Sequence, residues 1–329
     1  MSGTIGHMTY AVLALREMKQ RGHSFVDLIE RHLPSYLAGT YLAADVMTLP
    51  GGYCTQCGGE YGYSSSRPDT CPVDGAVVEP YLLKHEGEQY APKEILRRFY
   101  GRSHLTFGWY VEDEQGLVIR WDELPDYLDA CLVDCLEFYP LEERSRSYVL
   151  GWMAHVVSDA LIKSKQPGLD LHLLNGTYTP ENRPIQDLYS FHEVGQRELG
   201  LDWATLLKDL AETPVEPIQL HCMRITSPRG KLAQRFPEGW IPQCEGLMLK
   251  VMAENRRFMR IYKRDILHEV ELHEGPNGLE CNEAQSRKAN GTTWPEMIRM
   301  CEAANFRSAL DYIGKSIADL FEQVEKKLI

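Results

Sequence analysis

The chain has 329 residues, of which 43% are hydrophobic, and a formal net charge of −12. This length allows one large domain or two smaller ones with a substantial core. The acidic balance argues against nucleic acid and anionic membranes as partners, because phosphate binding depends on clustered Lys and Arg. We find neither a secretion signal nor an apolar run that could span a membrane, and therefore expect a cytoplasmic protein. In that compartment, nine cysteines predict thiols or metal ligands rather than disulfides.

Helical periodicity dominates the first two hundred residues. Apolar residues three and four apart predict helices over 10–18 and 25–32, with Ser24 capping the second and Pro34 ending it or starting the next. Further helices are expected at residues 93–100, 124–138 and 145–163. The sequence therefore predicts a mainly α fold with a helical core over 1–200.

Two segments depart from this pattern. Residues 50–90 replace helix formers with Gly, Tyr, Ser and Cys, which indicates an insertion of short strands and turns. Residues 201–329 form a C-terminal extension with a proline-rich start, a charged helix over 246–268 and closing helices over 292–328. The closing helices could complete the core, cover a site or form a surface for self-association, and the sequence leaves these alternatives open.

The insertion carries a cysteine motif. Cys54-Thr-Gln-Cys57-Gly-Gly is followed after thirteen residues by Cys71-Pro-Val-Asp74-Gly. This is the two-knuckle layout of a zinc ribbon, with Asp74 in place of the fourth cysteine. Because zinc accepts carboxylate oxygen, Asp74 can complete the site, and His85 is the competing fourth ligand. We expect a closed, structural zinc site; the alternative is a loop of free thiols.

A second motif lies in the helix expected at 145–163. In His155-Val-Val-Ser-Asp159 the spacing of four places the imidazole and the carboxylate on one helix face. A buried carboxylate among apolar neighbours is costly unless a charge compensates it, and a divalent cation does so most strongly. The alternative is an ion pair with Lys163, one turn later.

Histidines and aspartates of ligand type recur along the chain in a particular order. They are His7, Asp45, His104, His155 and Asp159. This order resembles that of the zinc-dependent phospholipase C family, whose helical fold is shared with fungal-type single-strand nucleases and binds up to three zinc ions. The segments Tyr41-Leu-Ala-Ala-Asp45 and Gly151-Trp-Met-Ala-His155 are similar to the family's approaches to its ligands. The resemblance covers residues 1–200, apart from the cysteine insertion.

The resemblance implies a particular set of roles. One ion would be held by Asp45, His104, His155 and Asp159. Asp159 would also reach a second ion at His7, and Asp45 would be the general base that activates the attacking water. The family's later ligands match less well. His172 follows Gln166-Pro167 at an altered distance, and His192 with Glu193 stands where the family has a His-x-x-x-Glu pair. We therefore expect a cluster of two or three zinc ions and one structural ion at the cysteines.

The activity that follows from the resemblance is zinc-dependent hydrolysis of a phosphate monoester or diester. Paired cations lower the pKa of water and neutralise phosphate oxygens. Since no interfacial helix is evident, a small soluble phosphoester or a nucleotide suits the chain at least as well as phosphatidylcholine, the family's founding substrate. One alternative is a non-catalytic, metal-stabilised binding or interaction protein with a degenerate hydrolase site. Another is different chemistry with iron or manganese in the His and carboxylate site.

Overall fold

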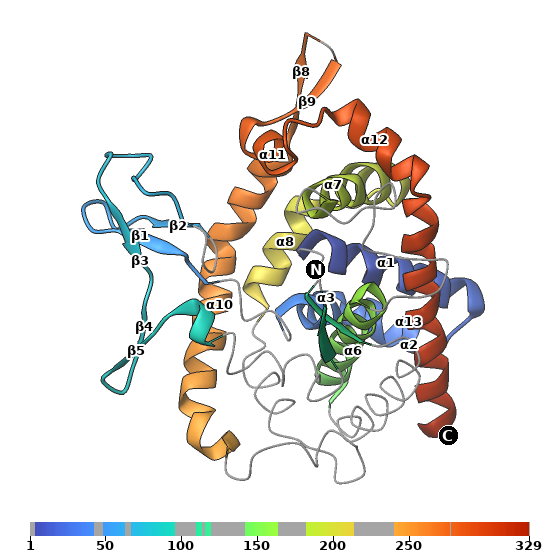
Figure 1. Ribbon diagram of the computed structural model, residues 1–329. Helices are drawn as coiled ribbons and strands as arrows, with labels where there is room; N and C mark the ends of the chain where they lie inside the picture. The colour runs from blue at the N-terminus through green and yellow to red at the C-terminus, as the bar shows by residue number, and fades with distance from the viewer. Residues whose placement is uncertain are drawn as a thin grey trace.

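The protein is mainly helical with small antiparallel sheets, as the sequence predicts (Figure 1). The computed structural model describes residues 4–42, 49–62, 67–95, 110–113, 116–119, 142–163, 182–213, 240–276 and 278–328. Of the predicted helices, 124–138 lies outside these residues, and 93–100 is described only to Ile95, where 92–95 are helical. In the described part of the chain, no helix is both long and apolar enough to cross a membrane.

The chain begins with three helices, α1 (Thr4–Arg21), α2 (Phe25–Arg31) and α3 (Leu33–Leu42). Ser24 is the N-cap residue of α2, as predicted, but its side chain makes no capping hydrogen bond. Instead, the Phe25 N–H donates to His23 Nδ1 at 3.2 Å. Pro34 lies in the first turn of α3, where its missing N–H costs no helical hydrogen bond.

Helix α6 (Glu143–Lys163) confirms the predicted helix over 145–163 and packs closely on α3. The contact depends on two glycines. A Cβ added at Gly39 would lie 2.1 Å from the Tyr148 carbonyl oxygen, and one at Gly151 would lie 1.9 Å from the Tyr36 carbonyl oxygen. The two helices therefore meet backbone to backbone, with no room for a side chain at either position.

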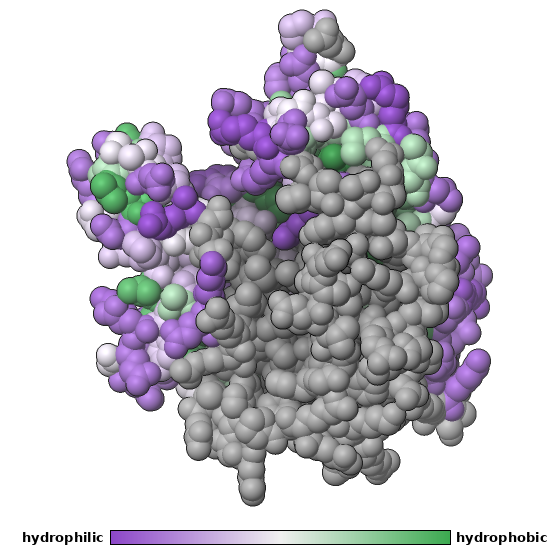
Figure 2. Space-filling model, viewed as in Figure 1, coloured by the Kyte–Doolittle hydropathy of each residue, from purple (hydrophilic) through white to green (hydrophobic). Residues whose placement is uncertain are grey.

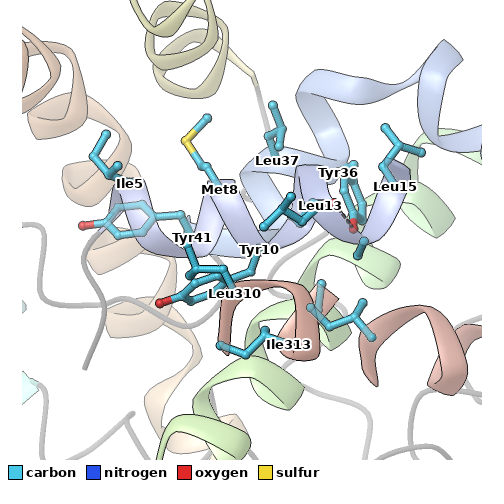
Figure 3. Packing of buried hydrophobic residues seen from close by; sticks show 14 of the residues in the cluster. Ile5, Met8, Tyr10, Leu13, Leu15, Tyr36, Leu37, Tyr41, Leu310 and Ile313 are labelled. Carbon is cyan, nitrogen blue, oxygen red and sulfur yellow. Dashed lines mark hydrogen bonds between the residues drawn. The ribbon is translucent and has the colours of Figure 1, made fainter. Parts of the chain in front are cut away.

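Four further helices contribute to the main core, together with parts of α10 (Trp240–Val270) and α12 (Trp294–Ala303). The four helices are α7 (Asn182–Tyr189), the π-helix η2 (Ser190–Glu198), α8 (Trp203–Glu212) and α13 (Phe306–Leu328). The largest fully buried side chains include Trp152, Tyr36 and Phe321. Figure 3 shows Leu310 and Ile313 of α13 beside residues of α1. Of the three alternatives for the closing helices, α13 therefore takes part in the core.

The insertion is a small β element at one side of the helical body. Strands β1 (Gly52–Cys54), β2 (Glu60–Tyr61) and β3 (Val78–Pro80) form an antiparallel sheet in the order β2-β1-β3. The hairpin β4 (Leu83–His85) and β5 (Glu88–Tyr90) follows. Leu83 and Tyr90 pack on Leu247 and Val251 of α10 (Trp240–Val270), so the hairpin attaches the insertion to that helix (Figure 1).

The remaining elements are short. They are β6 (Tyr110–Asp113), β7 (Gly116–Ile119), β8 (Leu272–Gly275), β9 (Gly278–Cys281), α11 (Glu283–Lys288) and α12 (Trp294–Ala303). The predicted start of α12 is confirmed: Pro295 lies in its first turn, and Glu296 accepts the Thr293 N–H at 2.9 Å. The charged helix predicted over 246–268 lies within α10.

Candidate metal centres

The two cysteine turns of the insertion have the same backbone geometry. The Cys54 carbonyl accepts the Gly58 N–H at 2.9 Å, and the Cys71 carbonyl accepts the Gly75 N–H at 2.9 Å. Both glycines have a left-handed backbone, with φ of 71° and 73°. A residue with a Cβ would be strained there, which explains the glycine after each knuckle. The insertion therefore contains two equivalent knuckles.

The side chains of the two knuckles also correspond. A backbone N–H two residues later points at each ligand atom. These contacts are Gln56 N–H to Cys54 Sγ (3.4 Å), Val73 N–H to Cys71 Sγ (3.4 Å), Gly59 N–H to Cys57 Sγ (3.3 Å) and Ala76 N–H to Asp74 Oδ1 (2.9 Å). Asp74 thus occupies the position of the second thiolate and accepts its hydrogen bond.

The four ligand atoms converge between the knuckles, all within 4.8 Å of one another. Cys57 Sγ lies 3.6 Å from Cys71 Sγ, and Cys54 Sγ lies 3.4 Å from Asp74 Oδ2. Tetrahedral zinc with S and O ligands requires separations of about 3.6 to 3.8 Å, so the residues fit the ion. His85 lies outside this group, beside Glu86 on the β4–β5 hairpin. Of the two fourth ligands considered, the structure therefore brings Asp74 to the site.

Hydrogen bonds favour the anionic forms of Cys71 and Asp74. For Cys54 the backbone N–H of Cys57 lowers the pKa of the thiol, but burial and the neighbouring thiols outweigh it and raise the pKa. Burial raises the pKa of the Cys71 thiol, but hydrogen bonds from the Tyr61 hydroxyl, at 3.2 Å, and from the Val73 N–H outweigh it, so the pKa is lowered. The Ala76 N–H is the main cause that lowers the pKa of Asp74. Deprotonated thiol and carboxyl groups are the forms that bind zinc.

A second group lies inside the helical body, where α1 meets α6. His7, His155 and Asp159 are 4%, 3% and 1% exposed, and their ligand atoms lie within 4.8 Å of one another. His7 Nε2 is 3.7 Å from Asp159 Oδ1, and the two imidazole rings stack with centroids 4.0 Å apart. Nitrogen and oxygen ligands of one zinc ion are about 3.4 Å apart, so these three residues also fit a cation.

A backbone contact fixes the protonation of His155. Its Nδ1 lies 2.7 Å from the carbonyl oxygen of Thr40 in α3. A carbonyl can only accept, so Nδ1 carries the proton of the neutral ring, and Nε2 then has the lone pair that a metal would bind. Metal-binding histidines commonly make this contact. The close approach of α3 and α6 at Gly39 and Gly151 brings the Thr40 carbonyl to this position.

His7 also contacts a serine, and the group therefore contains the residue types of a Ser-His-Asp triad. Ser158 Oγ lies 3.1 Å from His7 Nδ1. However, the hydroxyl donates to the His155 carbonyl at 2.9 Å, and Ser158 is 1% exposed. In a triad the carboxylate hydrogen-bonds the histidine ring nitrogen that faces away from the serine. Asp159 Oδ1 lies 3.7 Å from His7 Nε2, too far for that hydrogen bond, so a metal is the better explanation of the group.

The other predicted ligands of the histidine cluster either lie outside the described residues or are placed apart from both groups. Asp45, His104 and His172 lie outside the described residues. Among the described residues, His192 and Glu193 of η2 are not within ligand distance of either group. His192 Nε2 lies 2.6 Å from the carbonyl of Val270, the last residue of α10, and its Nδ1 lies 2.8 Å from Gln196 Oε1. Glu193 pairs with Arg197. Here His192 caps a helix, since the last carbonyls of a helix have no intrahelical donor.

Sequence reasoning missed Thr40 and Ser158. Ser158 had a detectable signal, because it is a polar residue beside Asp159 in an otherwise apolar helix. Thr40 contributes its carbonyl, which every residue has, so no sequence pattern could have identified it. Comparisons of the chain with protein-family models, with curated proteins and with solved structures found no match. The geometry of the two groups therefore carries the functional argument.

Proposed function

We propose that the protein is a metal-dependent hydrolase of a small phosphate ester. The observation that carries the proposal is the convergence of His7, His155 and Asp159, buried between α1 and α6 with His155 in the tautomer that binds metals. A carboxylate buried this deeply costs free energy unless a charge compensates it. The resemblance adds Asp45, His104 and His172 as further ligands, with Asp45 as the general base.

The charge of this group supports an anionic substrate. Two neutral imidazoles and one carboxylate reduce the charge of a divalent cation from +2 to +1. Such a cation supplies neutralisation of phosphate oxygens and a lowered pKa of the attacking water. His7 and His155 orient the ion without cancelling its charge, and Asp159 offers two oxygens, enough to reach a second ion. Zinc, iron and manganese all accept this donor set, so the metal must be measured.

The cysteine group has a different part in the proposal. Four protein ligands fill a tetrahedral ion and leave no position for water, so this site stabilises the insertion. An ion held by Cys54, Cys57, Cys71 and Asp74 would bind the two knuckles to each other. We therefore assign the hydrolysis to the histidine group alone.

The test is elemental analysis of the full chain purified without added metal, together with hydrolysis of p-nitrophenyl phosphate and its diester. We expect wild type to contain at least two metal ions per chain. His155→Ala should lose hydrolysis and the ions of the histidine group but keep the cysteine ion. Cys57→Ala should lose only the cysteine ion. His23→Ala is the matched control, because His23 is also buried but accepts the Phe25 N–H and should leave metal content and hydrolysis unchanged. If His155→Ala keeps all its metal, the proposal is wrong.

A second candidate is a non-catalytic binding protein that uses the insertion. Tyr53, Val73, Val77 and Leu82 are exposed apolar side chains of the insertion, which forms a lobe beside α10 (Figure 2). This candidate predicts one zinc ion per chain, released when the thiols are modified, and no hydrolysis. The metal count therefore separates the two candidates.

A further inference from the structure

Ser158 links the two histidines of the buried group. Its hydroxyl donates to the His155 carbonyl at 2.9 Å and lies 3.1 Å from His7 Nδ1. A hydroxyl has one proton, and here a carbonyl, which cannot donate in return, receives it. With the hydroxyl proton directed at the carbonyl, Ser158 Oγ accepts a hydrogen bond from His7 Nδ1. In this arrangement His7 Nδ1 carries the proton of the neutral ring and Nε2 keeps its lone pair.

We propose that Ser158 is a positioning residue that holds His7 in the Nδ1–H tautomer, so that Nε2 faces the cation shared with His155 and Asp159. The inference rests on the metal site of the proposed function, although the tautomer can be measured without metal. Thr40 and Ser158 then have parallel roles. The carbonyl of one and the hydroxyl of the other each accept an Nδ1–H, from His155 and His7 respectively.

The opposite tautomer of His7 would disable the group. A proton on Nε2 would face Asp159 Oδ1, which lies 3.7 Å from Nε2, too far for a hydrogen bond in the observed geometry. A small rotation of the ring would close that gap, and the resulting hydrogen bond would occupy two ligands at once. Ser158 opposes this state, because its hydroxyl would have to give up the hydrogen bond to the His155 carbonyl in order to donate to the Nδ1 lone pair of His7.

The experiment uses three variants of the full chain. Ser158→Ala removes the acceptor, and Ser158→Thr keeps a hydroxyl that can still donate to a carbonyl of the preceding helical turn. Ser147→Ala is the matched control. Ser147 lies on the same helix, is also fully buried and donates to the His32 carbonyl at 3.2 Å. Thermal unfolding of each variant verifies that it folds.

Two measurements report the role of Ser158. Long-range ¹⁵N–¹H NMR of metal-free protein shows which nitrogen of His7 is protonated, with His7→Gln used for assignment. Competition with a chelating indicator gives zinc affinity, and Co²⁺ spectra separate the sites, since thiolate ligands produce a charge-transfer band that histidine and carboxylate ligands do not.

For wild type, Ser158→Thr and Ser147→Ala we expect an Nδ1–H tautomer of His7 and equal zinc affinity. In Ser158→Ala, His7 should shift to Nε2–H, and affinity at the histidine group should fall about 10- to 100-fold, the usual effect of losing such a partner. The cysteine site should be unchanged. The inference is overturned if wild-type His7 is protonated on Nε2, if Ser158→Ala changes neither tautomer nor affinity, or if Ser158→Thr fails to restore both. A wild type that shows these tautomers and binds metal without hydrolysing esters would contradict the proposed function and leave this inference standing.

Discussion

At the scale of single residues, Asp74 shows how a turn can hold a carboxylate where the matching turn holds a thiol. Asp74 corresponds to Cys57 of the other knuckle. It accepts the Ala76 N–H as Cys57 accepts the Gly59 N–H, and it lies opposite Cys54. Although Asp74 carries a carboxylate instead of a thiol, the backbone turn brings its Oδ2 within 3.4 Å of Cys54 Sγ. The knuckle geometry, rather than the residue type, determines which side chain faces the other knuckle.

This equivalence gives a prediction. Asp74→Cys should retain zinc and bind it more tightly, because a fourth thiolate is a softer ligand in the same turn. Co²⁺ spectra should show a stronger charge-transfer band than in wild type. Asp74→Ala, which keeps the turn but removes the ligand, should weaken zinc binding. Unchanged affinity in Asp74→Ala would mean that Asp74 does not bind the ion.

His192 is a second example at the scale of single residues. Its side chain was predicted to be a metal ligand, and in the structure it caps the end of α10. His192→Ala should lose the hydrogen bond to the Val270 carbonyl and lower the free energy of unfolding by about 1 kcal/mol. Metal content should not change. Denaturant unfolding and elemental analysis measure the two effects. Loss of metal from this variant would show that His192 is a ligand, as the resemblance implies.

At the scale of elements, the packing of α3 on α6 is the decisive contact. It depends on Gly39 and Gly151 and places the Thr40 carbonyl against the His155 ring. A helix with glycine in its interior is intrinsically less stable, by about 1 kcal/mol relative to alanine. In this protein the two glycines allow α3 and α6 to approach backbone to backbone, which alanine at either position would prevent.

We therefore expect Gly39→Ala and Gly151→Ala each to destabilise the protein by about 3 kcal/mol or more, since backbone atoms cannot move aside as side chains can. Each should also weaken metal binding at the histidine group. Gly246→Ala on α10 is the matched control, because its Cβ would meet only side-chain atoms, those of His85 at 3.1 Å and Glu86 at 3.9 Å. That variant should be as stable as wild type or slightly more stable. Equal effects at all three positions would contradict the proposed role of the α3–α6 contact.

At the scale of the whole molecule, α13 returns to pack beside α1 and connects the C-terminal part of the chain to the body that holds the histidine group (Figures 1 and 3). Charged residues reinforce this arrangement at the surface. Glu198 of η2 accepts hydrogen bonds from Arg307 of α13, at 2.6 and 2.7 Å, and also pairs with Arg16 of α1. One carboxylate thus connects three elements.

The network predicts a pH dependence. Hydrogen bonds from Arg307, followed by those from Arg16, lower the pKa of Glu198 from 4.5 to about 2. A carboxyl whose pKa is depressed on folding contributes stability above its unfolded pKa and loses it as pH falls through the folded pKa. The contribution should therefore be complete above pH 4.5 and disappear toward pH 2. Because the side chain is 35% exposed, we expect only about 1 kcal/mol.

Denaturant unfolding of wild type and Glu198→Gln across this pH range measures the effect. The difference in free energy of unfolding should shrink as pH falls. Glu269→Gln is the control, since Glu269 is equally exposed and pairs with Lys288 at the surface. A difference between wild type and Glu198→Gln that is constant with pH would show that the pair does not contribute through charge.

The sequence by itself determined the features that lie within one element. Periodicity predicted the helices over 145–163 and 246–268, the His155 and Asp159 spacing placed both on one helix face, and the knuckle motif identified the cysteines that converge. These succeed because a helix or a tight turn fixes the relative positions of residues a few places apart.

Only the tertiary structure decided which distant residues meet. It brought His7 to His155 and Asp159, chose Asp74 over His85, placed His192 on the end of α10 and packed α13 into the core. These outcomes depend on how whole helices pack. The contact of α3 with α6, for example, requires two glycines whose spatial neighbours lie more than a hundred residues away in the sequence. Local spacing carries no information about such contacts, because packing is settled by the fit of complete surfaces.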